Sequence, residues 1–210
     1  MTLLHWISVI WIVVCLISAS WAAWDVVADR PRMWIMMLVW PLTMLYLGPL
    51  GLWFYRRTRR RRGQAPFSEA VLKGAMHCGA GCAVGDFAGE WLVFLLGISI
   101  LGSELLTKYV FAFTLAYSFG IFFQYFAIAP MRKLAPGPGI VAALKADTLS
   151  LVAFEVGMFA WMAVTYLLLP GLTPVRPEYW FMMQVAMMLG LATTFPVNWW
   201  LIRTGWKERM

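Results

Sequence analysis

Long apolar runs alternate with short polar segments along the whole chain. The six longest runs cover residues 3–24, 33–55, 68–101, 109–129, 148–169 and 179–202. A helix needs about 20 mostly apolar residues to cross the hydrocarbon core of a bilayer. The pattern therefore predicts an all-α fold, a polytopic membrane bundle with six transmembrane helices.

Charged residues gather in the connections between these runs. A dense basic segment follows the second run, with six arginines between Arg56 and Arg62. Cytoplasmic loops of membrane proteins carry an excess of lysine and arginine. If every run crosses the membrane once, most of the 17 Lys and Arg residues fall on one side. We therefore expect a multi-pass membrane protein with both termini cytoplasmic and with Arg30 and Arg32 on the outer side.

The composition supports a membrane protein and excludes a separate soluble domain. The chain of 210 residues is 62% hydrophobic and 13% charged, with a net charge of +7. Because the basic residues lie in short loops without an aromatic platform, they favour contact with anionic lipid headgroups, at Arg56 to Arg62, over nucleic acid. The first run lacks a preceding basic region, which predicts a retained helix and not a cleaved signal.

Residues 74–90, at the start of the third run, carry two side-chain stripes with a spacing of four. Residues four apart lie on one face of a helix. Small residues at this spacing let a neighbouring helix approach closely. The first stripe consists of glycines, and the second carries two thiols followed by two carboxyls. The small stripe consists of Gly81, Gly85 and Gly89, and the polar stripe of Cys78, Cys82, Asp86 and Glu90.

Other polar residues interrupt the apolar runs at similar depth. Ionisable side chains in hydrocarbon are costly and usually face the interior of a helix bundle. We expect Asp86 and Glu155 to approach one another there and to serve in proton or charge coupling. The wider predicted polar cluster contains Glu90, Gln124, Asp147, Thr148 and Asn198.

Three motifs together resemble a bacterial integral-membrane family known only as a domain of unknown function. The first is His77-Cys78-Gly79-Ala80-Gly81-Cys82 with Gly85-Asp86, and the others surround Asp147 and Asn198. The resemblance covers a four-helix domain at residues 67–206. Residues 1–62, with two helices and the basic loop, lie outside it. The resemblance implies a location in a bacterial inner membrane and implies that these polar positions belong together, but it implies no activity.

The thiols suggest a metal site. Thiolates with nearby imidazole suit a soft ion such as copper(I), or zinc. We predict binding by Cys78 and Cys82, assisted by His77, in a protein that binds or transports the ion. His77 points about 100° away from Cys78 on a regular helix, which weakens a single three-residue chelate. Two distant histidines, His5 and His77, predict no haem, and no nucleotide is expected.

Two other functions remain open at this stage. The glycine stripe could dock a membrane partner or a second copy of the chain, which would make the protein an assembly subunit. Cys78 and Cys82 could instead exchange electrons as a dithiol. A disulfide requires Cβ atoms ~3.5–4.5 Å apart, closer than the ~5–6 Å between residues four apart on a helix, so it would need local unwinding.

Overall fold

The computed structural model describes residues 2–31, 33–61 and 63–209, so Arg32, Arg62 and Met210 lie outside the described residues. The described residues form six helices, each long and apolar enough to cross a membrane. This confirms the predicted all-α fold class. The helices are α1 (Thr2–Ala28), α2 (Met36–Arg59), α3 (Phe67–Leu96), α4 (Glu104–Arg132), α5 (Pro136–Leu168) and α6 (Pro177–Arg203).

Helix α2 does not follow a simple crossing path, because it breaks at Gly48. This residue has φ +52° and ψ −127°, outside the helical region. A left-handed φ favours glycine, and the following Pro49 cannot donate to the preceding turn. The break lies against the middle of α1, where a Cβ built on Gly48 would be 2.9 Å from the Cys15 sulfur. The two halves of α2 fold back on one another, with the Trp40 and Tyr55 rings 4.9 Å apart.

Both ends of α2 therefore lie at the same end of the bundle. Near the end of α2, the Tyr55 hydroxyl donates to Asp25 at 2.5 Å, and Arg59 donates to the Asp29 carbonyl at 2.8 Å. Near its beginning, Trp34 packs on Phe126 of α4. Helix α2 is thus a re-entrant hairpin. Its length and hydropathy match those of a spanning helix, so the apolar pattern could not distinguish the two.

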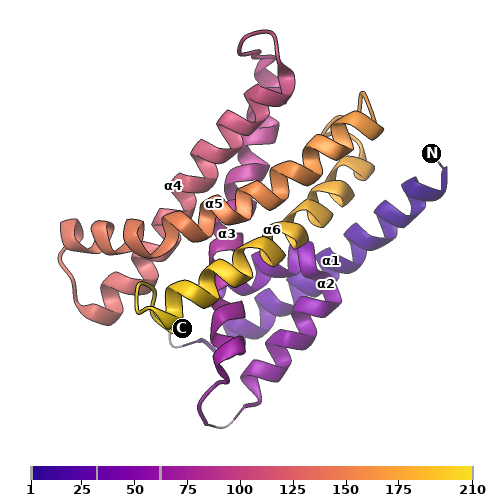
Figure 1. The fold of residues 1–210 in the computed structure, drawn as a ribbon. Coiled ribbons are helices and arrows are strands. Elements are labelled where there is room, and N and C mark those ends of the chain that lie inside the picture. The colour runs from indigo at the N-terminus through magenta and orange to yellow at the C-terminus, as the bar shows by residue number, and fades with distance from the viewer. Residues whose placement is uncertain (1, 32, 62, 210) are drawn as a thin grey trace.

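The hairpin corrects the expectation that both termini share one side. The beginning of α1 lies beside the beginning of α6, where His5 contacts Glu178 at 3.0 Å. The residues after α6 lie beside the beginning of α3, where the Arg209 guanidinium is 4.8 Å from the Phe67 ring centroid. The N and C marks accordingly lie at opposite ends of the molecule (Figure 1).

We call the end that carries the arginine-rich loop and the residues after α6 the basic end. Arg30, expected on the outer side, lies here beside Asp29 and Arg59. Among the described lysines and arginines, only Lys108 and Arg176 belong to the opposite end, before or early in α4 and α6. The described lysines and arginines are therefore divided more unequally between the two ends than they would be if all six helices crossed the membrane. Under the positive-inside rule this asymmetry predicts a cytoplasmic basic end and an N-terminus on the other side.

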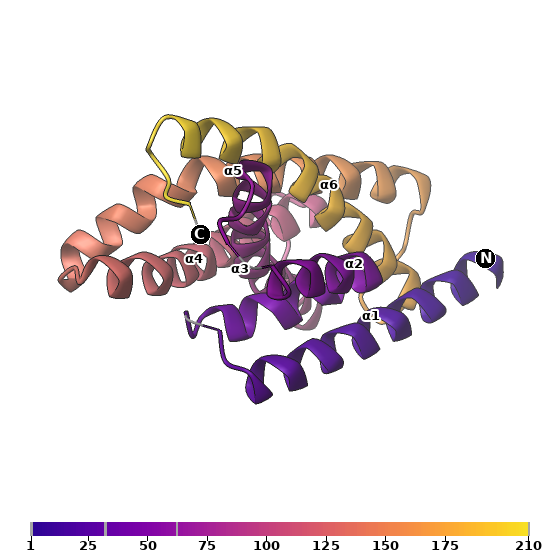
Figure 2. The same cartoon turned by 90° about the horizontal axis from the view of Figure 1, so that it is seen from below.

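Helix α3 occupies the centre of the molecule. It packs against α2, α4, α5 and α6, and from below it lies between the α1–α2 pair and the α5–α6 pair (Figure 2). It ends at Gly97, which adopts the left-handed conformation common after helices, and so stops short of the predicted residue 101. Large apolar side chains such as Leu3, Ile10, Val141 and Leu167 are exposed on the outer faces of the bundle, as contact with lipid requires.

Candidate functional site

The glycine stripe of α3 packs directly on the backbone of α4. A Cβ built on Gly81 would lie 2.7 Å from the Cα of Gly120, and one on Gly89 would lie 2.9 Å from the Cα of Ala112. A Cβ on Gly85 would overlap the backbone of Ala116. The groove is therefore filled by a helix of the same chain and offers no open surface to a partner. It fixes the rotation of α3, which turns the polar stripe inward.

The polar stripe, Cys78, Cys82, Asp86 and Glu90, forms a continuous file along α3, which we call the polar file. All four side chains are buried. Cys78 and Cys82 are both free thiols, adjacent to one another. Because four-residue steps climb about one helical turn each, the file extends from near the basic end toward the opposite end.

Glu155 of α5 joins the middle of the file. Its carboxyl lies beside Cys82 and near Asp86. The structure thus brings Asp86 and Glu155 together in the bundle interior, with 0% and 1% of their surfaces exposed. Neither carboxyl has a hydrogen-bond partner among the described residues. Buried polar groups are nearly always partnered in folded proteins, so two unpartnered acids beside two thiols make this part of the interior a candidate functional site.

The re-entrant hairpin adds Tyr46, which the sequence did not single out. Its ring is fully buried, and its hydroxyl would lie 2.8 Å from a Cβ on Gly79. The hydroxyl therefore reaches α3 between the two cysteines, and it has no hydrogen-bond partner in the described part of the chain. Irregular backbone at membrane depth is tolerated where it is buried in protein or lines a cavity. The Gly48-Pro49 pair was the available signal for this break.

A second polar group lies at the basic end of the file. The Lys207 ammonium, fully buried, is 2.9 Å from the Asp147 carboxylate and 3.3 Å from the Ser150 hydroxyl. Ser150 in turn donates to the Asn198 side chain at 2.7 Å. The apolar pattern does not distinguish Lys207 from the other basic residues near the end of the chain, Arg203 and Arg209. The burial of Lys207 could not be predicted, because it depends on how the chain turns after α6.

Three other residues of the predicted site do not belong to the polar file, namely His77, Gln124 and Thr148. His77 packs edge-on against Phe123 of α4, with the ring centroids 6.1 Å apart. His77 and Gln124 are fully buried, and their side-chain polar atoms lack partners among the described residues. Thr148 lies apart from the file, since its hydroxyl bonds to the Leu144 carbonyl and is 3.0 Å from the Tyr117 hydroxyl.

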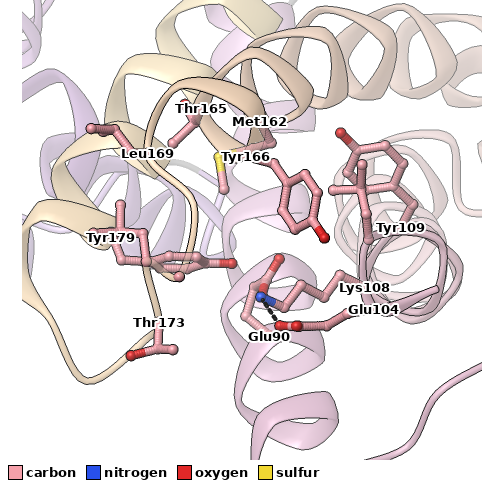
Figure 3. Close-up of a pocket in the computed structure, with 13 residues that line it drawn as sticks. Glu90, Glu104, Lys108, Tyr109, Met162, Thr165, Tyr166, Leu169, Thr173 and Tyr179 are labelled. Atoms are coloured by element: carbon pink, nitrogen blue, oxygen red, sulfur yellow. Dashed lines mark ion pairs between the residues drawn. The ribbon is translucent and has the colours of Figure 1, made fainter. Parts of the chain in front are cut away.

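The opposite end of the file opens into a small cavity between α3, α4, α5 and α6. Lys108 is 2.9 Å from Glu104 and 3.8 Å from Glu90. Its ammonium also lies 5.2 Å from the Tyr179 ring centroid. Figure 3 shows the Tyr179 hydroxyl pointing toward Glu90. Glu104 and Lys108 both line this cavity, where 58% of the Glu104 side chain but only 8% of the Lys108 side chain is exposed.

The predicted set of His77, Cys78 and Cys82 is not assembled as one metal site. In the described residues, no group of three or more His, Cys, Asp and Glu side chains has an arrangement that could hold a metal ion. His77 lies against α4, whereas the thiols lie near α2 and α5. The arrangement offers two thiols with two carboxyls close by.

One family model matches most of the chain. Described as a domain of unknown function, DUF4396, it matches residues 69–207. The chain belongs to the DUF4396 family. The DUF4396 region contains the polar file, Glu155, Asp147 and Lys207, whereas α1 and the hairpin with Tyr46 precede it. No curated protein and no solved structure matches the chain.

Proposed function

We propose that the protein is a multi-pass protein of a bacterial inner membrane that binds a soft monovalent cation, copper(I), inside the bilayer and transports it. The observation that carries the proposal is the joint burial of Cys78, Cys82, Glu155 and Asp86 in the interior of the bundle. Intramembrane ionisable groups of this kind mark ion pathways. Thiolate ligands suit soft ions, which include copper(I) and zinc.

The number of donors favours copper(I) over zinc. Structural zinc sites hold the ion with four ligands, and catalytic sites with three. Two adjacent thiols suffice for a soft monovalent ion. Binding converts both S–H groups to thiolates, and the two protons released leave for the aqueous phase, with the carboxyl groups of Glu155 and Asp86 as the proton carriers nearest to the thiols. One copper(I) ion with two thiolates carries a single negative charge, and neutral carboxyl groups beside it add no further charge to the bundle interior.

Metal titration tests this proposal. Purified protein, kept reduced, is loaded with silver(I), a soft surrogate that is stable in air, and the bound metal is measured by elemental analysis. We expect one ion for each chain, and none after Cys78→Ser or Cys82→Ser. Cys15→Ser is the control, because Cys15 lies between α1 and the hairpin, away from the file. Wild-type protein that takes up no stoichiometric silver would overturn the proposal.

We also propose that the arginines at the end of α2 bind anionic lipid headgroups. Arg56 stacks on Trp21 at 4.2 Å and Arg57 lies 5.5 Å from the Trp53 ring centroid, so both are held beside aromatic side chains suited to the membrane interface. A shallow pocket between them is lined by Arg60 as well. In native mass spectrometry of protein purified in detergent, Arg56→Ala with Arg57→Ala should retain less phosphatidylglycerol than the wild type, and should retain as much phosphatidylethanolamine.

A further inference from the structure

The segment after α6 folds back onto the bundle. Gly205 has φ +77°, and the backbone amides of Trp206 and Lys207 both donate to the Leu201 carbonyl, at 2.9 and 3.1 Å. This turn reverses the chain, since a left-handed glycine after a helix redirects the backbone. We call residues 204–209 the hook.

One side chain of the hook enters the bundle while its neighbours stay outside. Lys207 is fully buried, whereas Trp206 and Arg209 are exposed. The Lys207 ammonium binds Asp147 of α5, and its Cε lies 3.7 Å from the position of a Cβ on Gly74 of α3. Gly74 precedes Cys78 by one helical turn. The lysine therefore fills the space between α3 and α5 on the basic-end side of the thiols.

Such a buried ion pair is costly to keep. Removing two charges from water consumes most of their mutual attraction, so a buried pair contributes little net stability, although breaking it by deleting one partner is strongly destabilising. The pair between the hook and α5 joins a short surface segment to the interior, whereas the other contacts of the hook, between Glu208 and Arg132 and between Trp206 and Lys145, lie at the surface. A contact that adds little net stability when complete, but is costly when one partner is left unpaired, suits a latch between two positions.

We propose that the hook is a gate over the thiol site, and that the Lys207–Asp147 ion pair is its latch. This inference rests on the proposed function, since it names how the buried site communicates with the basic end. When Lys207 withdraws, it leaves a polar cavity lined by Asp147, Ser150 and Asn198. A polar cavity of this kind fills with water. Water and hydrated ions then reach Cys78, one turn further along α3.

Thiol accessibility tests the gate without any metal. The protein, in a Cys15→Ser background, is reconstituted in vesicles and treated with a charged, membrane-impermeant methanethiosulfonate reagent. Mass spectrometry of the peptide that carries Cys78 and Cys82 gives the rate of modification. Labelling of a buried group follows the population of open molecules. We expect Lys207→Ala to raise this rate by about tenfold or more, because it removes the latch and leaves Asp147 unpaired.

Two further variants separate the latch from a general loss of packing. Arg209→Ala removes an exposed contact of the same hook, with Phe67, and should leave the rate unchanged. Asp147→Asn combined with Lys207→Met removes both charges and restores a closed hook, so its rate should fall back toward that of the wild type. Circular dichroism confirms that each variant remains helical.

The gate is overturned if folded Lys207→Ala protein is labelled no faster than the wild type. Its thiols must still react after unfolding, which shows that the reagent is active. An equal rise in Arg209→Ala would also overturn the gate, because the effect would then come from the hook as a whole. Failure of silver binding in the wild type would overturn the proposed function alone. The two failures are therefore distinguishable.

Discussion

The Arg59 guanidinium donates a hydrogen bond to the Asp29 carbonyl at 2.8 Å, although a helix of apolar residues lies between them in the sequence. This contact places the loop after α1 and the loop after α2 at one end of the molecule. It makes α2 a re-entrant hairpin, and it moves Arg30 from the predicted outer side to the basic end.

The first prediction concerns this topology. In cells expressing a Cys15→Ser protein, a cysteine introduced as Arg30→Cys should resist an impermeant thiol reagent until the membrane is permeabilised. Leu101→Cys, in the loop between α3 and α4, should react in intact cells, since residue 101 is 91% exposed. Labelling of Arg30→Cys from outside would restore a simple crossing of α2 and would contradict the hairpin.

Gly48→Ala should destabilise the protein by more than a backbone penalty alone. A non-glycine residue at φ +52° and ψ −127° costs roughly 1–3 kcal/mol, and the new methyl group would also press on the Cys15 sulfur, 2.9 Å away. Gly97→Ala is the comparison variant, because Gly97 has φ +61° and ψ +27°, in the milder left-handed α region, with no atom within 4 Å of the Cβ position. Thermal unfolding in detergent should show the larger loss for Gly48→Ala. Equal losses would contradict the break of α2 at Gly48 and its packing on α1.

The contact between α3 and α4 gives a third prediction. Gly85→Ala places a methyl group into the backbone of Ala116, and overpacking of this kind costs about 1–3 kcal/mol or more. Gly74→Ala, in the same helix, meets its nearest neighbour at 3.7 Å and gains up to ~1 kcal/mol of helix propensity. The unfolding temperature should therefore fall in Gly85→Ala and rise slightly in Gly74→Ala. A neutral Gly85→Ala would show that the two helices do not touch here.

The apolar pattern was sufficient to predict an all-α chain with helices of membrane-spanning length, because their number, approximate bounds and apolar length depend on local sequence. The spacing of the stripes also predicted which residues share a face of α3. The path of α2 was not predictable in this way. Its composition is that of a spanning helix, and the break at Gly48 depends on the conformation of one residue and on its packing against Cys15.

The candidate site was predictable only where its residues share one helix. Cys78, Cys82 and Asp86 lie on one helix, where periodicity fixes their relative positions. The side chains that complete the site arrive through tertiary structure, from distant segments of the chain. Tyr46 depends on the hairpin, and Lys207 depends on a turn after the last helix. Neither carries a local pattern that separates it from an ordinary aromatic or basic residue near a membrane.

The last prediction tests whether the hairpin takes part in the site. The Tyr46 hydroxyl is buried against α3 without a hydrogen-bond partner among the described residues. Removing an unpartnered buried hydroxyl does not lower stability, because no hydrogen bond is lost and its desolvation penalty disappears. If the hydroxyl instead donates to a thiolate when a soft ion is bound, its loss weakens the complex, since a hydrogen bond to a charged group contributes ~1.5–3 kcal/mol.

Tyr46→Phe should therefore unfold at the same temperature as the wild type or higher, and bind silver(I) about tenfold or more weakly in a competition titration. Tyr166→Phe removes a hydroxyl at the cavity near Glu90, distant from the thiols, and should change neither quantity. Unchanged silver affinity in Tyr46→Phe would mean that the hairpin does not contact the ion and that only α3 and α5 form the site. A loss of both thermal stability and silver affinity would instead show that the Tyr46 hydroxyl stabilises the packing of the hairpin tip. A hydroxyl that contacts only the bound ion makes no contribution to the stability of the protein without the ion.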